Sequence, residues 1–396
     1  MSRRRVRHCV IGAALAALVP AWVQAQAAGS GNQLLHVVYQ QWTPSSGVGT
    51  DSVLVTGVSQ AAVPLAFHFG GNGRFTFDVS GGAAMSRVRV RQGTAPERTL
   101  ELNGITDIRG LLTATAFNDH VAFLAGGTVP TGATSLAPAQ LTALGAIAAP
   151  ATRSPVPVFG GGGGGTAGLT ATQQVGDWSV SVGSGYERRF RFVPFTELVA
   201  GTPVDASIAP GAVVTASGQL DGEIAGAAVT LDASVRQFFA DTFAVTQGTR
   251  LSRSVYKLGP LTNAALRIRP TTRSARDLVL TFAVQQRAPY EVLGRGQVAE
   301  SGASLFSAAI AGTVLRAGGW RIGAGVETRT YSGIKSDSSL VAAAFNDVTG
   351  SVNVVIPLRG SELIVTTAAT TGSLTIRNKA AVGMQRLLLR GQLFVF

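Results

Sequence analysis

Residues 178–186 alternate between two kinds of side chain, and this alternation constrains the fold more than any other feature of the chain. In an extended strand, Trp178, Val182 and Tyr186 share one apolar face that has an aromatic residue at each end. The opposite face is small or charged, and Arg189 continues it. Successive side chains of a strand point to opposite faces, so one face meets an apolar medium and the other a polar one. About nine residues also suffice for a tilted strand to cross a bilayer.

The same pattern returns after the turn predicted at 318–319. Trp320 begins an apolar face, whereas Arg321, Glu327 and Arg329 share the other face. Indole rings are favoured where an apolar layer meets water, so we expect both tryptophans at one membrane interface. The predicted interface aromatics are Trp178, Tyr186 and Trp320. A water-soluble β-sandwich would alternate in the same way, so the two chain ends must decide between these folds.

The N-terminus has the pattern of a secretory signal peptide. Four arginines between positions 3 and 7 precede an apolar run from Cys9 to Val23, and Ala25 and Ala27 follow. This run is shorter than the roughly 20 residues of a membrane-spanning helix, which predicts cleavage after Ala27. The alternative is an N-terminal anchor helix. We expect a signal peptide at 1–27 and one mature domain at 28–396, without the only cysteine, Cys9, and therefore without a disulfide or a thiolate-bound metal.

Composition favours a membrane barrel over a soluble domain. Charged residues make up 14% of the chain, against roughly 25% in soluble domains. After the N-terminal run, no apolar stretch is long enough for a spanning helix, which leaves closed β-barrels as the spanning structure. The formal charge of +12 comes mainly from arginines spread singly along strands, so we predict no nucleic-acid partner. We also predict no cofactor and no metal.

The fold class that we predict is an all-β, antiparallel transmembrane barrel of about 14 strands, with 12 to 16 allowed. Tight turns are expected at 118–119, 176–177, 221–222, 318–319 and 359–360, and long loops at 130–165, 193–211, 239–250 and 332–338. Strand-like segments are 34–42, 75–90, 105–117, 121–129, 213–220, 229–238, 278–287, 305–315, 340–356 and 363–370. Short periplasmic turns and long external loops are typical of outer-membrane barrels.

The largest predicted loop, 130–165, contains a helical pattern. Four apolar residues recur at helical spacing between 135 and 147, and Ser135 is the expected N-cap. The helix either constricts the barrel mouth or packs on its rim. The glycine run 160–165 leads into a strand and lacks the Lys-Ser/Thr of a phosphate loop, so we interpret it as a hinge or a close backbone contact.

The C-terminal sequence resembles the assembly signal of bacterial outer-membrane barrels. Gly391 leads into Phe394 and Phe396, at the third-last and last positions. The resemblance implies that the barrel-assembly machinery binds the last strand and that the protein resides in the outer membrane of a Gram-negative bacterium, in contact with its lipid. If the strand alternates regularly, Phe394 and Phe396 share their face with Arg390 and Arg386. Either a bulge near Gly391 therefore shifts the alternation by one residue, or both phenylalanine rings face inward. We favour the bulge.

A second resemblance concerns residues 100–270, which are similar to proteobacterial outer-membrane transport barrels associated with phenol and aromatic degradation, and more distantly to long-chain fatty-acid channels. It rests on residues 105–109, 126–132 and 155–160 and on the short helix. The fatty-acid channels have a plug ahead of their first strand, whereas we expect the first strand here to start within a few residues of the predicted cleavage site, without room for a plug. The resemblance implies transport without naming a solute.

Arginine in lipid is costly, so we predict that the charged residues of alternating strands face the lumen. The lumen-facing candidates are Arg87, Arg89, Arg91, Arg189, Asp232, Arg267, Arg269, Arg321, Glu327 and Arg329. The excess of arginine over acid predicts an interior that favours anionic solutes such as aromatic carboxylates. In the alternative, the arginines pair with acids as a ladder that braces the wall.

We therefore expect a passive channel or uptake barrel rather than an enzyme. The competing interpretations are a structural or surface barrel and, with less support, a hydrolase. His120 next to Asp119 could suggest a base with its orienting acid, but adjacent strand residues face opposite sides and both lie in a predicted turn. We predict no catalytic residues.

Overall fold

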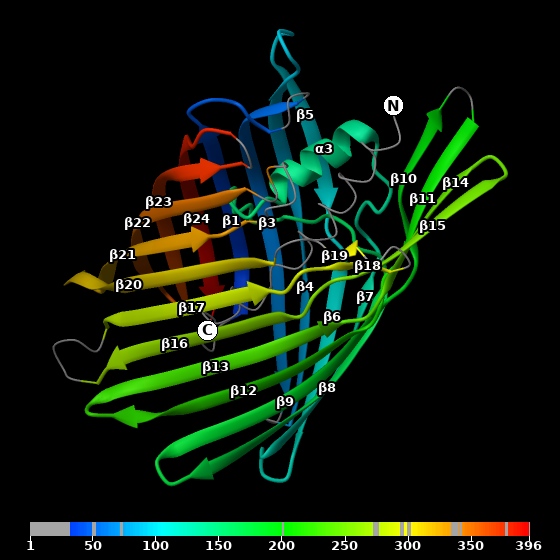
Figure 1. Cartoon of the computed structure of the whole chain (residues 1–396). Helices are drawn as coiled ribbons and strands as arrows, with labels where there is room; N and C mark the ends of the chain where they lie inside the picture. The colour runs from blue at the N-terminus through cyan, green and yellow to red at the C-terminus, as the bar shows by residue number, and fades with distance from the viewer. Residues whose placement is uncertain are drawn as a thin grey trace.

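A computed structural model describes residues 32–395 of the chain, apart from 50–52, 72–73, 200–201, 272–276, 294–296, 299–301, 334–339, 341–342 and 377–378. These residues form a closed antiparallel barrel (Figure 1). Its wall strands, in chain order, are β1 (Asn32–Pro44), β3 (Leu54–Gly71), β4 (Phe75–Arg91), β5 with β6 (Arg98–Ile105, Ile108–Ala116), β7 (Val121–Val129), β8 (Gly164–Val175), β9 (Trp178–Arg189), β12 (Val213–Ile224), β13 (Ala227–Phe238), β16 (Leu261–Pro270), β17 (Val279–Arg287), β20 (Ala303–Ala317), β21 (Trp320–Tyr331), β22 (Ala344–Leu358), β23 (Ser361–Thr375) and β24 (Val382–Val395).

The wall has sixteen strands when β5 and β6 are counted as one interrupted strand, since both pair with β4. The barrel closes because β1 pairs with β24 on one side and with β3 on the other. The estimate of about 14 strands was therefore low, although the allowed range included 16. The predicted strand 105–117 is broken at residues 106 and 107, where the inserted loop attaches.

The tight turns lie together at one end of the barrel, which we call the short-turn end. Four of the predicted turns are found, at 117–120, 176–177, 318–319 and 359–360. The prediction at 221–222 is wrong, because Asp221 and Gly222 continue β12 and the chain turns at Ala225 and Gly226. Both turn residues have positive φ, 49° and 76°, which a two-residue hairpin turn of type I′ requires.

A second sheet of six strands stands at the opposite, long-loop end of the barrel and projects beyond the wall (Figure 1). Its strands are β10 (Phe192–Val199), β11 (Thr202–Ala209), β14 (Asp241–Gln247), β15 (Arg250–Lys257), β18 (Glu291–Leu293) and β19 (Gln297–Val298). The stretches 193–211 and 239–250, which we predicted to be irregular loops, are therefore mainly strands. Antiparallel pairing satisfies their backbone groups, which explains the difference. The predicted loop 332–338 lies largely outside the described residues.

Large apolar side chains cover the outward face of the wall. Exposed examples on β3, β4, β6, β7, β8, β9, β13, β17, β20, β21, β22 and β24 are Leu65, Phe67, Phe69, Phe75, Phe77, Leu112, Phe123, Leu169, Val182, Leu231, Val235, Phe282, Val284, Phe306, Ile310, Val326, Val348, Val352, Leu387 and Leu389. A surface this apolar needs an apolar environment. None of the described helices is long and apolar enough to cross a membrane.

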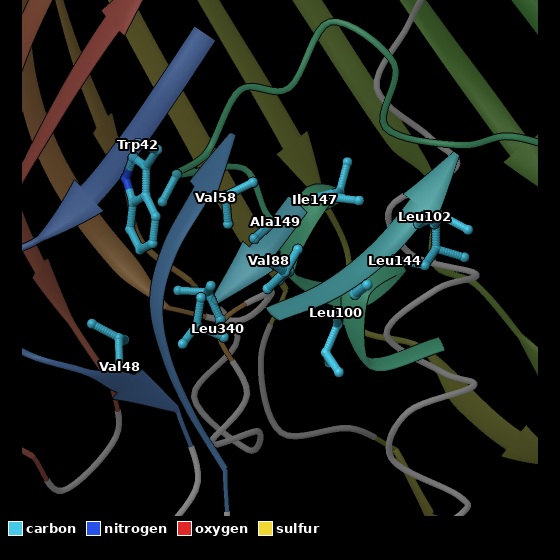
Figure 2. Packing of buried hydrophobic residues seen from close by; sticks show 14 of the residues in the cluster. Trp42, Val48, Val58, Val88, Leu100, Leu102, Leu144, Ile147, Ala149 and Leu340 are labelled. Carbon is cyan, nitrogen blue, oxygen red and sulfur yellow. The ribbon is translucent and has the colours of Figure 1, made fainter. Parts of the chain in front are cut away.

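The only helix among the described residues, α3 (Pro138–Ile147), lies inside the long-loop end of the barrel (Figure 1). Its Leu144 and Ile147 join one buried cluster with inward-facing Val58, Val88 and Leu102 of β3, β4 and β5 (Figure 2). The predicted helix was correct, but it begins two residues later than expected. Its first residue is proline, whose fixed φ suits the first turn of a helix.

Ser135 is not the N-cap of α3, which is another correction. The N-cap is Ala137, and its backbone N–H donates to Gln140 Oε1 at 2.9 Å. The glutamine side chain thus satisfies a donor at the helix start without a capping hydroxyl. Because α3 packs on the inward face of three strands, the constriction interpretation of the loop is favoured over packing on the rim.

The last strand pairs with β23 without interruption from Val382 to Val395, so the bulge that we predicted near Gly391 is absent from this pairing. Phe394 is instead 6% exposed and faces inward with Arg386 and Arg390, while Leu389 and Val395 face outward. The irregularity at this seam lies in β1, between residues 33 and 35. Phe396 lies outside the described residues, so its role in assembly stays a prediction.

Candidate functional site: the lumen beside the inserted loop

The inserted loop between β7 and β8 begins and ends at one point of the wall. Asp107, in the break between β5 and β6, accepts hydrogen bonds from the backbone N–H of Gly132 at 2.9 Å and of Gly161 at 2.7 Å. A Cβ placed on Gly160 would lie 2.6 Å from the Ala133 carbonyl oxygen, so the two ends of the loop are in backbone contact. The glycine run is thus explained as a close approach of two backbones.

Beyond α3 the loop is held to the wall by amide side chains. Gln60 of β3 donates to the Val156 carbonyl at 3.0 Å and accepts from the Val156 N–H at 2.8 Å. Gln40 of β1 donates to the Thr152 carbonyl at 3.0 Å and, at 3.3 Å, to Ser154 Oγ. Both glutamines are buried, so these bonds replace water and fix the loop along the inward face of the wall.

Arg153, between Thr152 and Ser154, connects the loop to a more distant strand. Its guanidinium donates to both carboxylate oxygens of Glu327 on β21, at 2.6 and 3.1 Å. The backbone of Arg153 has φ of +53°, a region that costs energy for a residue with a Cβ. A strained backbone combined with a bidentate ion pair indicates that the position of this side chain is imposed by the surrounding structure.

Three arginines gather around one carboxylate on the opposite part of the wall. Glu187 accepts from Arg189 at 3.0 Å and lies 3.6 Å from Arg236, and Arg109 also acts on it electrostatically. Arg109, Glu187 and Arg189 line one small cavity with the glycines at the start of β8. Positive charge therefore exceeds negative charge within this group of four side chains, and Arg189 also acts electrostatically on Asp241.

A second basic cluster lies on β21, β22 and β24. Arg329 pairs with Asp347 through two nitrogen atoms, and both side chains are buried. Arg386 lies within electrostatic range of this pair and of Arg153 and Glu327. Together with Arg153 of the loop and its partner Glu327, the cluster has three arginines and two carboxylates. Positive charge is therefore again in excess.

The structure places seven of the predicted lumen residues on the inward face: Arg189, Asp232, Arg267, Arg269, Arg321, Glu327 and Arg329. Arg321 pairs with Glu362 at 2.7 Å near the short-turn end, and Asp232 is affected electrostatically by Arg267. The predicted interface aromatics Trp178, Tyr186 and Trp320 share the outward, apolar face of their strands.

The remaining three candidates, Arg87, Arg89 and Arg91, face outward, so their predicted inward orientation is wrong. They alternate with Val88 and Val90, which are buried beneath the inserted loop. Arg87 pairs with Glu101 at 3.2 Å, and Arg89 lies 3.6 Å from Glu97. These ion pairs lie at the long-loop end of β4, beyond its apolar segment, where the penalty for arginine in lipid does not apply.

The most central charged residues were not predictable from the alternation of the sequence. Four arginines were not among the candidates: Arg153 of the inserted loop, and Arg109, Arg236 and Arg386 of the two charged clusters. The alternation of apolar and polar residues is weak around three of them and absent around Arg153. A His68–Asp78 pair at 2.7 Å on β3 and β4 was also missed, because cross-strand register brings the two residues together. Alternation predicts that His68 and Asp78 both face inward, but only the register of β3 and β4 places them opposite each other.

The predicted turn residues Asp119 and His120 serve the turn itself. Asp119 accepts from Thr115 Oγ1 at 2.7 Å, while His120 Nδ1 lies 3.0 Å from the Thr172 carbonyl oxygen. Across the described part of the chain, no group of three or more His, Asp or Glu is placed to hold a metal ion.

Polar side chains on the inward face remain in contact with solvent near the short-turn end. The His68 and Asp78 side chains are 58% and 44% exposed, and Gln219 on β12 is also exposed. The lumen is therefore not filled by side chains at this end, in contrast to the long-loop end, where α3 and its cluster occupy the β3–β5 side.

The chain matches no protein-family model and no curated protein. Solved structures with a similar fold include OccK11 (OpdR) of Pseudomonas aeruginosa, with 13% identity, 91% of this chain and 95% of that chain covered, and a TM-score of 0.42. OprB of Pseudomonas putida has 10% identity, 90% and 92% coverage and a TM-score of 0.43. OpdK of Pseudomonas aeruginosa, solved with vanillate, has 9% identity, 90% and 97% coverage and a TM-score of 0.42.

Proposed function

We propose that the protein is a passive outer-membrane channel that admits small solutes and favours anions. A closed barrel satisfies all backbone groups of its wall, and its outward face is apolar, as a membrane-spanning barrel requires. The N-terminal pattern of a signal peptide supports export. Because outer-membrane barrels have short periplasmic turns and long external loops, we propose that the short-turn end faces the periplasm and that the six-stranded sheet lies outside the cell.

The observation that carries the preference for anions is the convergence of Arg109, Arg189 and Arg236 on the single carboxylate of Glu187. Charges that line a water-filled passage with low-dielectric walls focus the field and raise the local concentration of the opposite ion. The ladder interpretation also has support, because Arg321 and Arg329 are each paired with an acid. We infer that the arginine–carboxylate ion pairs brace the wall, and that the arginines in excess over carboxylates select the solute.

Reversal potentials in planar bilayers under a KCl gradient test this proposal. We expect the purified barrel to favour chloride over potassium, and the double variant Arg109→Gln with Arg321→Gln to lower the permeability ratio by about twofold or more. Both side chains face the lumen, and the second substitution leaves Glu362 uncompensated. Arg87→Gln is the matched control, because Arg87 is exposed on the outward face, and it should leave the ratio unchanged.

Two results would overturn this assignment. Cation selectivity, or an unchanged ratio in the double variant, would contradict the anion preference and leave the channel intact. A correctly folded barrel that conducts no ions would instead support the alternative of a structural or surface barrel. The partners that we propose are outer-membrane lipid, the barrel-assembly machinery and an anionic solute.

A further inference from the structure

Five buried polar atoms without a hydrogen-bond partner lie on the inward face of β1 and β24, where the barrel closes. Three of them surround one position of this strand pair: Trp42 Nε1 and Gln40 Oε1 on β1 and Arg386 Nη1 on β24. The other two, His36 Nε2 and Arg390 Nε, lie further along the same seam. Buried polar groups are normally hydrogen-bonded, so each unsatisfied atom needs an explanation. Three such atoms around one position of a strand pair indicate a shared ligand rather than three separate defects.

Trp42 and Arg386 are direct partners in the β1–β24 register. Directly opposed side chains on one face have Cβ atoms about 4.5–5.5 Å apart, so the indole and the guanidinium are neighbours. Trp42 is 0% exposed and Arg386 is 4% exposed. Trp42 belongs to the buried apolar cluster (Figure 2), but its Nε1 has no hydrogen-bond partner.

The other nitrogen atoms of Arg386 are already used. Nε and Nη2 donate to Thr370 Oγ1 at 3.3 and 2.9 Å, so only Nη1 remains to donate. The hydroxyl is neutral and does not compensate the charge of the guanidinium. A buried cation without a hydrogen-bonded anion is strongly destabilising.

The carboxylates nearest to Arg386 are engaged elsewhere. Asp347 is bound by Arg329 through two nitrogen atoms, and Glu327 is bound by both terminal nitrogen atoms of Arg153. Among the described residues, no carboxylate forms an ion pair with Arg386. Arg390 lies four residues further along β24, on the same inward face, and adds further positive charge.

We propose that Trp42 and Arg386 form a binding site for one small monovalent anion of halide size. The anion accepts from Trp42 Nε1 and Arg386 Nη1, and a water of its hydration shell donates to Gln40 Oε1. It enters from the lumen past Arg153, whose side chain is 39% exposed. The site compensates the excess charge of the wall behind the loop, and it does not depend on whether the barrel conducts solutes.

Iodide quenching of Trp42 fluorescence tests the site, because iodide is both a halide and a quencher that acts on contact. Trp178 and Trp320 are replaced by phenylalanine, so that Trp42 is the only tryptophan of the mature domain at 28–396. Sodium iodide is titrated against sodium gluconate at constant ionic strength. We expect saturable quenching by iodide and almost none by neutral acrylamide, because Trp42 is otherwise completely buried.

Arg386→Met in the same background should abolish the saturable component, and Arg321→Met, which removes an inward arginine far from Trp42 along the strands, should preserve it. Quenching by iodide that is linear and no stronger than by acrylamide would overturn the proposal. Saturable quenching that survives in folded Arg386→Met would overturn it as well. If Arg386→Met does not fold, competition between chloride and iodide in the single-tryptophan protein tests the site. Chloride should displace iodide and restore the fluorescence, and quenching that chloride does not reverse would overturn the proposal.

Discussion

Excision of residues 134–159, with Ala133 joined to Gly160, should raise the single-channel conductance by roughly twofold or more, because the inserted segment occupies part of the lumen. The ends of this segment are already in backbone contact, so the new peptide bond requires little rearrangement of the wall. Asp107 keeps its acceptor contacts to Gly132 and Gly161 in the shortened chain. Conductance in planar bilayers is the measurement, and heat-modifiable migration on a gel establishes that the barrel has folded.

The matched control for the excision removes only the tether to β21. Arg153→Ala with Glu327→Ala eliminates the bidentate ion pair but leaves α3 packed in its apolar cluster. We expect this variant to increase fluctuations of the open current and to change its mean less than the excision does. An excised barrel that folds and conducts like the parent would show that the loop does not set the narrowest part of the passage.

Val182→Arg should destabilise the barrel by about 2–4 kcal/mol in lipid bilayers, whereas Ser181→Arg should cost much less. Val182 is 58% exposed on the outward face, halfway between Trp178 and Tyr186. Ser181 is its neighbour in the chain but faces the lumen, where its hydroxyl bonds to Thr172. Arginine at 182 must therefore enter the apolar layer, and arginine at 181 meets water.

Reversible urea unfolding in liposomes measures both free energies of unfolding. The pair is matched, because the two positions are adjacent in one strand and receive the same side chain. Equal losses of stability, or a greater loss for Ser181→Arg, would contradict the assignment of the outward face to lipid. The loss of one neutral hydrogen bond at 181 should contribute only about 1 kcal/mol.

Several features of the fold followed from local sequence. The alternation of 178–189 was sufficient to assign both faces of β9, because period two is a property of the strand itself. Turns at 176–177 and 318–319 were found for a similar reason, since glycine permits the positive φ of a tight hairpin. The short helix was also visible from its spacing of apolar residues.

Positions that depend on where a strand leaves the membrane were not predictable from alternation. Arg87, Arg89 and Arg91 alternate in the same way as the residues of β9, yet they face outward. The reason is that α3 covers the inward face of this part of β4, so Val88 and Val90 are buried against protein instead of lipid. The same alternating pattern has opposite meanings at the two ends of one long strand.

The sequence by itself determined the strand period, most of the tight turns and the class of closed antiparallel barrel, because these depend on neighbours in the chain. Only the tertiary structure decided which arginines meet in the lumen. Arg153 reaches Glu327 across a separation of 174 residues, and Trp42 meets Arg386 only because the first and last strands pair. Such contacts depend on barrel closure and register, which no local pattern specifies.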